Sequence, residues 1–188
     1  MKFIILAASI FSLQVSAACL VEATAKDSKV SWTAFKTPKK VGVNGEFRKF
    51  SIQSTKKSHE TISSLLKDSS FEIDTTSVST GNPERDQKIV KSFFTTNEKA
   101  VSIKGKVTSV NKNEATVQLD INGTKKDVKM LLTEAAEMNK LEGEINVLDF
   151  NLKSNLEAIT AACKALHEGV TWPEVKIAIE FKSTKTCK

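Results

Sequence analysis

Apolar and polar side chains alternate with a period of two along most of this sequence. Val101, Ile103 and Val107 are separated by serine, lysine and glycine, and the same alternation continues through Val117. A period of two places successive side chains on opposite faces of a β-strand, so it is typical of antiparallel strands with one dry and one wet face. The Asn-Gly pair at positions 122–123 separates two such runs and predicts a tight hairpin turn.

The alternation predicts eight strands and an all-β fold. Their expected ranges are 29–36, 42–53, 69–76, 100–110, 114–121, 124–133, 141–152 and 173–183. Two of these runs change phase, one between Phe47 and Phe50 and the other between Val147 and Phe150. A bulge that bends a long strand would account for each change, and a sheet that closes on itself needs such bends. We therefore predict an eight-stranded antiparallel barrel with a few short helices.

Three short helices are expected between the strands. Ser58 would cap the first, Asn82 followed by Pro83 would start the second, and the capping-box sequence Ser154–Glu157 would start a third that ends at Gly169. Their apolar faces recur at helical spacing and consist of Ile62, Leu65 and Leu66, then Ile89, Val90, Phe93 and Phe94, then Leu156, Ile159, Cys163 and Leu166. Each face predicts a helix that packs against the sheet. The second helix has an alternative interpretation as a lid over the barrel mouth.

The N-terminal residues predict an exported protein. A lysine precedes an apolar run over residues 3–13, and small residues follow at 15–17, which is typical of a secretory signal peptide. The run is too short to span a bilayer, and no later segment approaches the roughly 20 apolar residues that spanning needs. We expect cleavage of residues 1–17 and a periplasmic protein, residues 18–188, that forms one domain without stable membrane insertion. Lipidation of Cys19 is the alternative, because the residues before it loosely resemble a lipoprotein signal.

Charge and composition argue against two broad functions. The formal net charge is +6, but the basic residues are dispersed singles and pairs such as Lys39-Lys40 rather than a stripe with interleaved aromatics. This pattern favours a solvated outer face, and no nucleic-acid partner is predicted. The chain has two histidines and no tyrosine, and it lacks a phosphate-binding glycine loop or a nucleophile motif. We therefore do not predict an enzyme.

Several segments together resemble the YceI-like family. They are Ser28–Trp32, Val43–Phe50, Phe71–Val78, Arg85-Asp86 ahead of Phe93-Phe94, and Ile121–Val128 with Gly143 to Phe150 after it. The resemblance implies an exported, lipocalin-like antiparallel barrel that holds a long isoprenoid chain, such as a polyprenyl compound or a quinone tail, or another long-chain amphiphile. It also implies that a homodimer is one expected assembly. Two departures are Gln87, where the family often has histidine, and the lack of a Tyr-Pro pair after the double Phe.

An eight-stranded barrel either is filled by its own side chains or encloses one small ligand. We predict enclosure, because most inward positions carry aliphatic side chains and only Trp32, Phe47, Phe71 and Phe181 are large. The predicted apolar pocket lining is Val30, Trp32, Phe47, Phe71, Ile73, Phe93, Phe94, Val101, Ile103, Val117, Leu119, Met130, Leu132, Ile145, Ile177 and Ile179. No cofactor is predicted beyond a bound polyprenyl lipid or quinone. A solid barrel that serves as an interaction module is the rival interpretation.

Three cysteines in an exported chain allow one disulfide and one free thiol. The first and last strands of an up-and-down barrel are neighbours, so we predict that Cys19 and Cys187 pair. Cys163 lies on the apolar face of the third helix, where an unpaired cysteine usually behaves as a small hydrophobe. His167 follows one turn later, and a metal- or thiol-dependent site centred on these two residues is the alternative function. Arg85-Asp86 is interpreted as a structural pair that anchors its helix.

Overall fold

The computed structural model describes residues 19–55, 59–67, 69–135 and 138–187. The predicted signal peptide, residues 1–17, and the predicted helix cap Ser58 lie outside the described residues and stay predictions.

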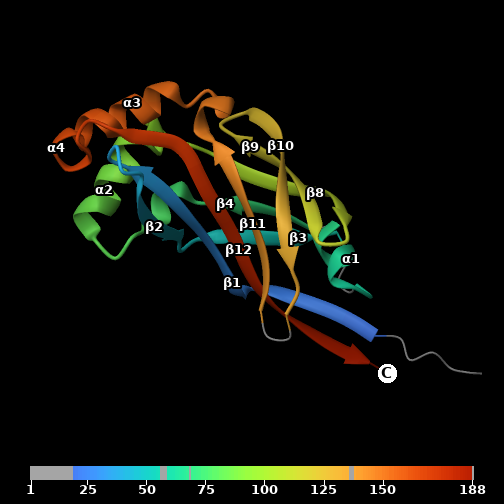
Figure 1. Cartoon of the computed structure of the whole chain (residues 1–188). Coiled ribbons are helices and arrows are strands. Elements are labelled where there is room, and N and C mark those ends of the chain that lie inside the picture. The colour runs from blue at the N-terminus through green and yellow to red at the C-terminus, as the bar shows by residue number, and fades with distance from the viewer. Residues whose placement is uncertain (1–18, 56–58, 68, 136–137, 188) are drawn as a thin grey trace, which may run out of the picture.

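A curled antiparallel sheet forms most of the described chain (Figure 1). Across the sheet the strands follow in the order β3 (Phe50–Ser54), β4 (Ser69–Ile73), β8 (Ile103–Asn111), β9 (Glu114–Ile121), β10 (Thr124–Thr133), β11 (Asn139–Asn146), β12 (Thr171–Cys187), β1 (Cys19–Lys36), β2 (Val41–Phe47) and β5 (Val78–Ser79). A separate two-stranded ribbon consists of β6 (Thr95–Thr96) and β7 (Lys99–Ala100). The sheet curls into a half-barrel, which confirms the predicted all-β antiparallel fold, although the number of strands differs.

The first predicted phase change is a bend in the segment 41–54, whose two halves lie near opposite ends of the strand order. Strands β2 and β3 are separated only by Arg48 and Lys49. At this bend the backbone N–H of Arg48 donates to the carbonyl of Ser77, and the carbonyl of Lys49 accepts from Asp74. The β2 half pairs with β1 and the β3 half pairs with β4, so the bend draws the two edges of the sheet together.

The second phase change is not the predicted bulge. Strand β11 ends at Asn146 and a 3₁₀ turn, η2 (Val147–Phe150), follows it. The side-chain oxygen of Asn146 accepts a hydrogen bond from the N–H of Leu148 at 2.9 Å, which competes with continued strand pairing. Asn151 then adopts a left-handed conformation, φ 58°, and turns the chain toward the next helix.

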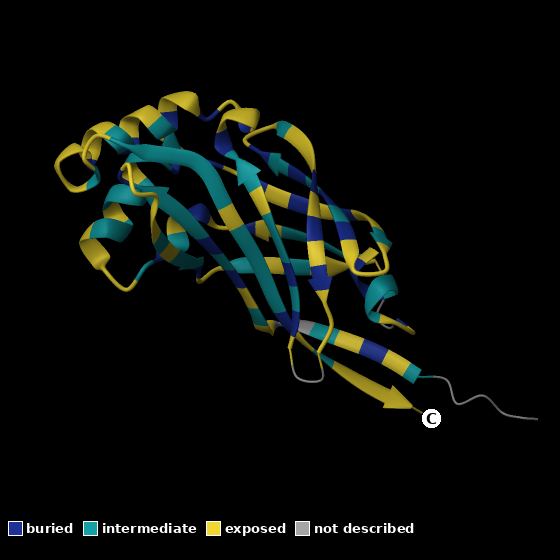
Figure 2. Cartoon of the chain, in the orientation of Figure 1, coloured by how far each residue is buried: buried dark blue, intermediate teal, exposed yellow. Residues whose placement is uncertain are grey.

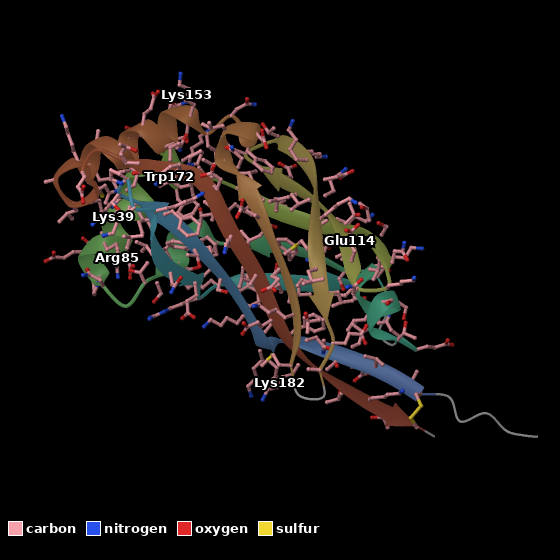
Figure 3. All side chains as sticks on the ribbon, viewed as in Figure 1. Lys39, Arg85, Glu114, Lys153, Trp172 and Lys182 are labelled. Atoms are coloured by element: carbon pink, nitrogen blue, oxygen red, sulfur yellow. A yellow bond between two sulfur atoms is a disulfide. The ribbon has the colours of Figure 1, made fainter. Side chains whose placement is uncertain are left out.

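Strands β1 and β12 are longer than predicted, and their outer ends form a ribbon that projects from the sheet (Figure 1). Cys19 pairs with Cys187 in register, and the two sulfur atoms are bonded at 2.02 Å. This confirms the predicted disulfide. Figure 3 shows the bond at the tip of this ribbon, at the opposite end of the molecule from Arg85 and Trp172.

Helices cover the other end of the curled sheet. They are α2 (Pro83–Ser92), α3 (Lys153–Ala162) and α4 (Lys164–His167), whereas α1 (Ile62–Lys67) packs near the projecting ribbon and a 3₁₀ turn, η1 (Thr75–Ser77), follows β4 (Figure 1). The predicted start of α2 is confirmed, because the side-chain oxygen of Asn82 accepts from the N–H of Arg85 at 3.0 Å and Pro83 occupies the first turn.

The predicted capping box of the third helix is wrong. Helix α3 begins at Lys153, so Ser154 lies inside its first turn, and the chain breaks into α4 at Cys163. Asn155 is buried, and its side-chain amide donates to the carbonyl of Phe93 at 2.7 Å and to the hydroxyl of Thr96 at 2.9 Å. The side chain of Asn155 therefore ties the first turn of α3 to the segment after α2, and no side chain caps the start of α3.

Buried positions alternate with exposed ones along β8, β9 and β10, as Figure 2 shows. The core lies inside the curl, with Met130, Leu141 and Val117 among its most deeply buried side chains. By contrast, α2 has no buried residue, and its apolar side chains are only half-buried. Within the described residues, no helix has the length and apolar character needed to cross a membrane.

Candidate ligand-binding cavity

A cavity of about 300 Å³, here called the main cavity, lies between the inner face of the sheet and helices α2 to α4. Its walls are mostly aliphatic and aromatic side chains. Ile103, Ile145 and Ile177 contribute the sheet side, and Ile89 and Leu156 contribute the helix side. The apolar face of α2 is therefore only half-buried because it borders this space.

Two further cavities continue inward from the main cavity. An inner cavity of about 60 Å³ shares Trp32, Phe47 and Ile103 with the main cavity. A distal cavity of about 190 Å³, toward α1, shares Val30 and Phe71 with the inner cavity. The three spaces form a row through the inside of the curled sheet, with shared side chains as the partitions. A flexible, narrow, apolar molecule is the shape that such a row accommodates.

The structure places most of the predicted pocket-lining residues on this row. Those on the main cavity are Trp32, Phe47, Phe93, Phe94, Ile103, Ile145 and Ile177. Those on the inner cavity are Val30, Phe71, Ile73, Val117, Leu119, Met130 and Ile179. That these residues contact a ligand stays a prediction.

Val101 and Leu132 are the exceptions, since they border none of these three cavities. Only 2% of Val101 and 3% of Leu132 is exposed. Val101 lies before β8, where its carbonyl accepts from the buried hydroxyl of Thr75. Leu132 is opposite Leu141 near the end of β10. Both residues point inward, as alternation predicts, but they lie where the protein fills its own interior.

Two large aromatic side chains lie along the wall and leave the centre open. Trp32 is directly opposite Gly45 across β1 and β2, and a Cβ atom at Gly45 would overlap its indole ring. Phe71 has the same relation to Gly105 across β4 and β8. A glycine opposite an aromatic residue lets the ring lie flat on the neighbouring strand. The side chains that were the best candidates to fill the barrel therefore help to keep it hollow.

The indole N–H of Trp32 has no hydrogen-bond partner among the residues that the structure describes. Its nitrogen atom is buried and makes no hydrogen bond, although Trp32 borders both the main and the inner cavity. An unpaired buried donor costs about 1–3 kcal/mol.

Polar and charged residues at the mouth of the main cavity were absent from the predicted lining. Lys36 comes from the end of β1, Arg85 and Lys88 come from α2, and His167 comes from α4. Periodicity identifies the apolar faces of strands and helices, but these residues flank those faces, so no pattern marked them. His167 was singled out only for its place beside Cys163.

Trp172 forms a fixed part of the rim. Its indole N–H donates to the carbonyl of Thr37 at 2.8 Å. The ammonium group of Lys40 lies 4.9 Å from the Trp172 ring centroid and 3.6 Å from the carboxylate of Glu174. These contacts tie the turn between β1 and β2 to the start of β12. Figure 3 shows Trp172 near Lys39, which belongs to that turn.

Arg85 and Asp86 both bind Thr80, which supports their predicted structural role. The carboxylate of Asp86 accepts from the N–H of Thr80 at 2.9 Å and from its hydroxyl at 2.5 Å. The guanidinium of Arg85 donates to that hydroxyl at 2.8 Å and to the Thr80 carbonyl at 3.1 Å. The loop before α2 and the first turns of the helix are therefore held together.

Cys163 and His167 both border the main cavity. Cys163 is a free thiol that is 7% exposed. Within the described residues, no group of three or more His, Cys, Asp or Glu side chains is placed to hold a metal ion. The Nδ1 atom of His167 is 3.0 Å from the hydroxyl of Thr171. Burial, and then the charges of Lys36 and Lys88, lower the pKa of His167.

Three solved structures with matching folds are informative. The Burkholderia cenocepacia protein BcnA is 17% identical, with a TM-score of 0.58, and the match covers 87% of this chain and 99% of BcnA. A polyisoprenoid binding domain from Saccharophagus degradans, implicated in plant cell wall breakdown, is 16% identical, with a TM-score of 0.54, over 90% of this chain and 100% of the domain. A mutant CJ YCEI protein is 18% identical, with a TM-score of 0.50, over 97% and 92% of the two chains.

At these identities the structural matches establish the fold alone. No curated protein matches the sequence. The family model described as YceI-like domain matches residues 22–183, which include all of the strands that surround the row of cavities except the outermost ends of β1 and β12. The chain therefore belongs to the YceI-like family.

Proposed function

We propose that this protein is a periplasmic binding or carrier protein that holds a long-chain amphiphile, an isoprenoid lipid or a quinone-type molecule, without catalysing a reaction. The row of apolar cavities behind a polar mouth carries the proposal. The tail would occupy the row and the head group would remain at the mouth. The solved polyisoprenoid binding domain with the same fold supports this class of ligand.

Burial of the tail would supply enough free energy for stable binding. Apolar surface removed from water is worth about 25 cal/mol per Å². A tail that hides roughly 300 Å² would thus gain about 7 kcal/mol before the costs of association. The volume of the main cavity alone lies at the lower end of the range of about 300–1,000 Å³ found for ligand pockets. The inner and distal cavities would extend it for a longer chain.

The proposal that the protein is not an enzyme rests on how its reactive side chains are used. Arg85 and Asp86 are engaged with Thr80, and His167 is within hydrogen-bond distance of Thr171. Export is supported by the disulfide, because such bonds persist mainly in oxidising compartments. A homodimer stays a prediction that the mass of the purified protein in solution would check.

Intrinsic fluorescence offers a direct test. The chain has two tryptophans and no tyrosine, and both Trp32 and Trp172 border the main cavity. A prenylated quinone, which quenches nearby indoles, should reduce the emission of the protein in a saturable manner. Organic extraction of protein purified without added lipid, followed by mass spectrometry, should recover a co-purifying amphiphile. If the quinone does not quench the emission and no amphiphile co-purifies, the proposed function is refuted.

A matched pair of substitutions locates the bound molecule. Ala34 borders the main cavity, whereas Ala158 is exposed on the outer side of α3. Ala34→Phe should fill part of the cavity and reduce quinone uptake, while Ala158→Phe adds the same side chain at the surface and should leave uptake unchanged. Equal uptake by the two variants would place the ligand elsewhere.

A further inference from the structure

Three cationic side chains converge on the mouth of the main cavity. Lys36 comes from β1, and Arg85 and Lys88 come from α2, one helical turn apart. All three are half-buried. Among the described residues that line this cavity, Glu84 is the one carboxylate. The mouth therefore has a positive charge balance above an apolar interior.

Among the described residues, Lys36 and Lys88 have no ion-pair partner, unlike several lysines of the sheet. The ammonium groups of the surface lysines Lys29, Lys104 and Lys129 each lie 3.1–3.2 Å from a carboxylate oxygen of a glutamate. No described carboxylate lies within 4.0 Å of the ammonium group of Lys36 or Lys88. A half-buried ammonium group without a counter-charge loses hydration and gains no ion pair in return. Such a pair of lysines is poised to receive an anion.

The other polar groups of the mouth leave this charge in place. The guanidinium of Arg85 is oriented by two hydrogen bonds to Thr80, whose hydroxyl also donates to the carboxylate of Asp86, so the position of Arg85 is fixed. His167 is reached by the charges of both Lys36 and Lys88, which helps to lower its pKa. Lys36, Lys88 and His167 come from three different elements and line the same cavity. The lowered pKa also keeps the imidazole neutral near pH 7, so it remains available as a hydrogen-bond partner.

We infer that the mouth of the main cavity selects an amphiphile with an anionic head group, a phosphate, diphosphate or carboxylate, through Lys36 and Lys88, with Arg85 as a third cation. This inference rests on the proposed function and specifies its ligand further. The tail supplies the bulk of the affinity by burial, and the head group supplies the preference, because charge-assisted contacts strengthen where water is partly excluded. A neutral quinone or alcohol with the same tail would leave the two ammonium groups without a counter-charge.

Ligands with identical tails test the inference. Geranylgeranyl phosphate and geranylgeraniol share one prenyl chain and differ only in the charge of the head group. Isothermal titration at low salt should give a dissociation constant at least about tenfold lower for the phosphate, and the difference should shrink as salt screens the charges. A long-chain fatty acid tests the carboxylate, and inorganic phosphate alone tests whether the mouth binds the anion without a tail, which we expect to be too weak to detect.

Variants assign the preference to the mouth. Lys36→Met with Lys88→Met keeps most of each side-chain stem and should abolish the difference between phosphate and alcohol. Lys153→Met removes an exposed lysine on α3 that lies near Glu157, and it should preserve that difference. Thermal unfolding would verify that each variant is folded, and the salt dependence of the unaltered protein provides a test that needs no variant.

The outcomes separate this inference from the proposed function. Binding of neither prenyl ligand would refute the proposed function and the inference with it. Equal binding of phosphate and alcohol, or a preference that survives in the double variant, would overturn the inference and leave the proposed carrier function standing. Tight binding of inorganic phosphate alone would also overturn it, since the mouth would then recognise a free anion rather than the head group of an amphiphile.

Discussion

Removal of the disulfide should destabilise the protein by a predictable amount. Replacing both Cys19 and Cys187 with serine removes the covalent link between the first and last strands, which closes a loop with a sequence separation of 168. In the chain-entropy description, the restriction that a cross-link places on the unfolded chain grows with the logarithm of loop length. For a loop of this size the relation gives about 5 kcal/mol at 25 °C as the largest expected loss of unfolding free energy.

The position of the bond in the native structure reduces this figure. The segment Thr184–Cys187 is exposed, and Leu20 and Glu22 opposite it are exposed as well. The register of β1 against β12 also shifts between Ala23 and Ser28, so the outer ribbon is paired separately from the main sheet. Without the bond this ribbon would fray and regain conformational entropy in the native state. We therefore expect a loss of about 3 kcal/mol, within the usual range for disulfides.

Urea unfolding followed by circular dichroism would measure the change. A loss of about 3 kcal/mol corresponds to a fall in Tm of about 6–12 °C for a chain of this length. Cys163→Ser serves as the control, because it removes the free thiol and keeps the disulfide. A loss under about 1 kcal/mol in the double variant would refute the reasoning from unfolded-state entropy, since fraying of a short ribbon does not cancel the restriction of the whole chain.

Three further predictions concern the cavity wall and its mouth. Gly105→Ala should lower the free energy of unfolding in urea by about 1–3 kcal/mol, because the new Cβ would overlap the ring of Phe71. Gly42→Ala is the control, since the nearest side-chain atom there is 3.3 Å away, and it should lower the free energy of unfolding less. Alkylation of Cys163 by a maleimide, followed by mass spectrometry, should slow when a prenyl ligand is bound, and an unchanged rate would place the ligand away from the thiol. Burial and two lysines lower the pKa of His167, so its contribution to stability is complete above pH 6.5 and is lost as the pH falls below that value. His167→Gln should therefore show a smaller fall in Tm between pH 7 and pH 5 than the unaltered protein.

Elements set by local sequence were predicted closely. Strands β9 and β10 have the predicted bounds, because an Asn-Gly turn fixes their register and apolar residues alternate along one side of β9 and along the same side of β10 from Val128 onward. The phase change after Val147 was ambiguous, since a bulge and a 3₁₀ turn shift the apolar positions in the same way. The predicted cap of α3 was wrong because the helix begins at Lys153, which places Ser154 inside the first turn. The buried Asn155 next to it bonds to groups about sixty residues earlier in the chain, and no local pattern relates those groups to it.

The hollow interior depends on distances that periodicity does not contain. Alternation and helical spacing identify which side chains face inward, but a face that packs against the sheet and a face that borders a cavity have the same pattern. Two sets of contacts keep the sheet and the helices apart. On the sheet side, aromatic rings lie flat over glycines. On the helix side, the bonds of Arg85 and Asp86 to Thr80 and the bond of Asn155 to Phe93 hold α2 and α3 in place. These contacts leave the apolar face of α2 half-buried. Because exposed apolar surface costs free energy, a guest that covers this face would stabilise the fold as well as bind to it.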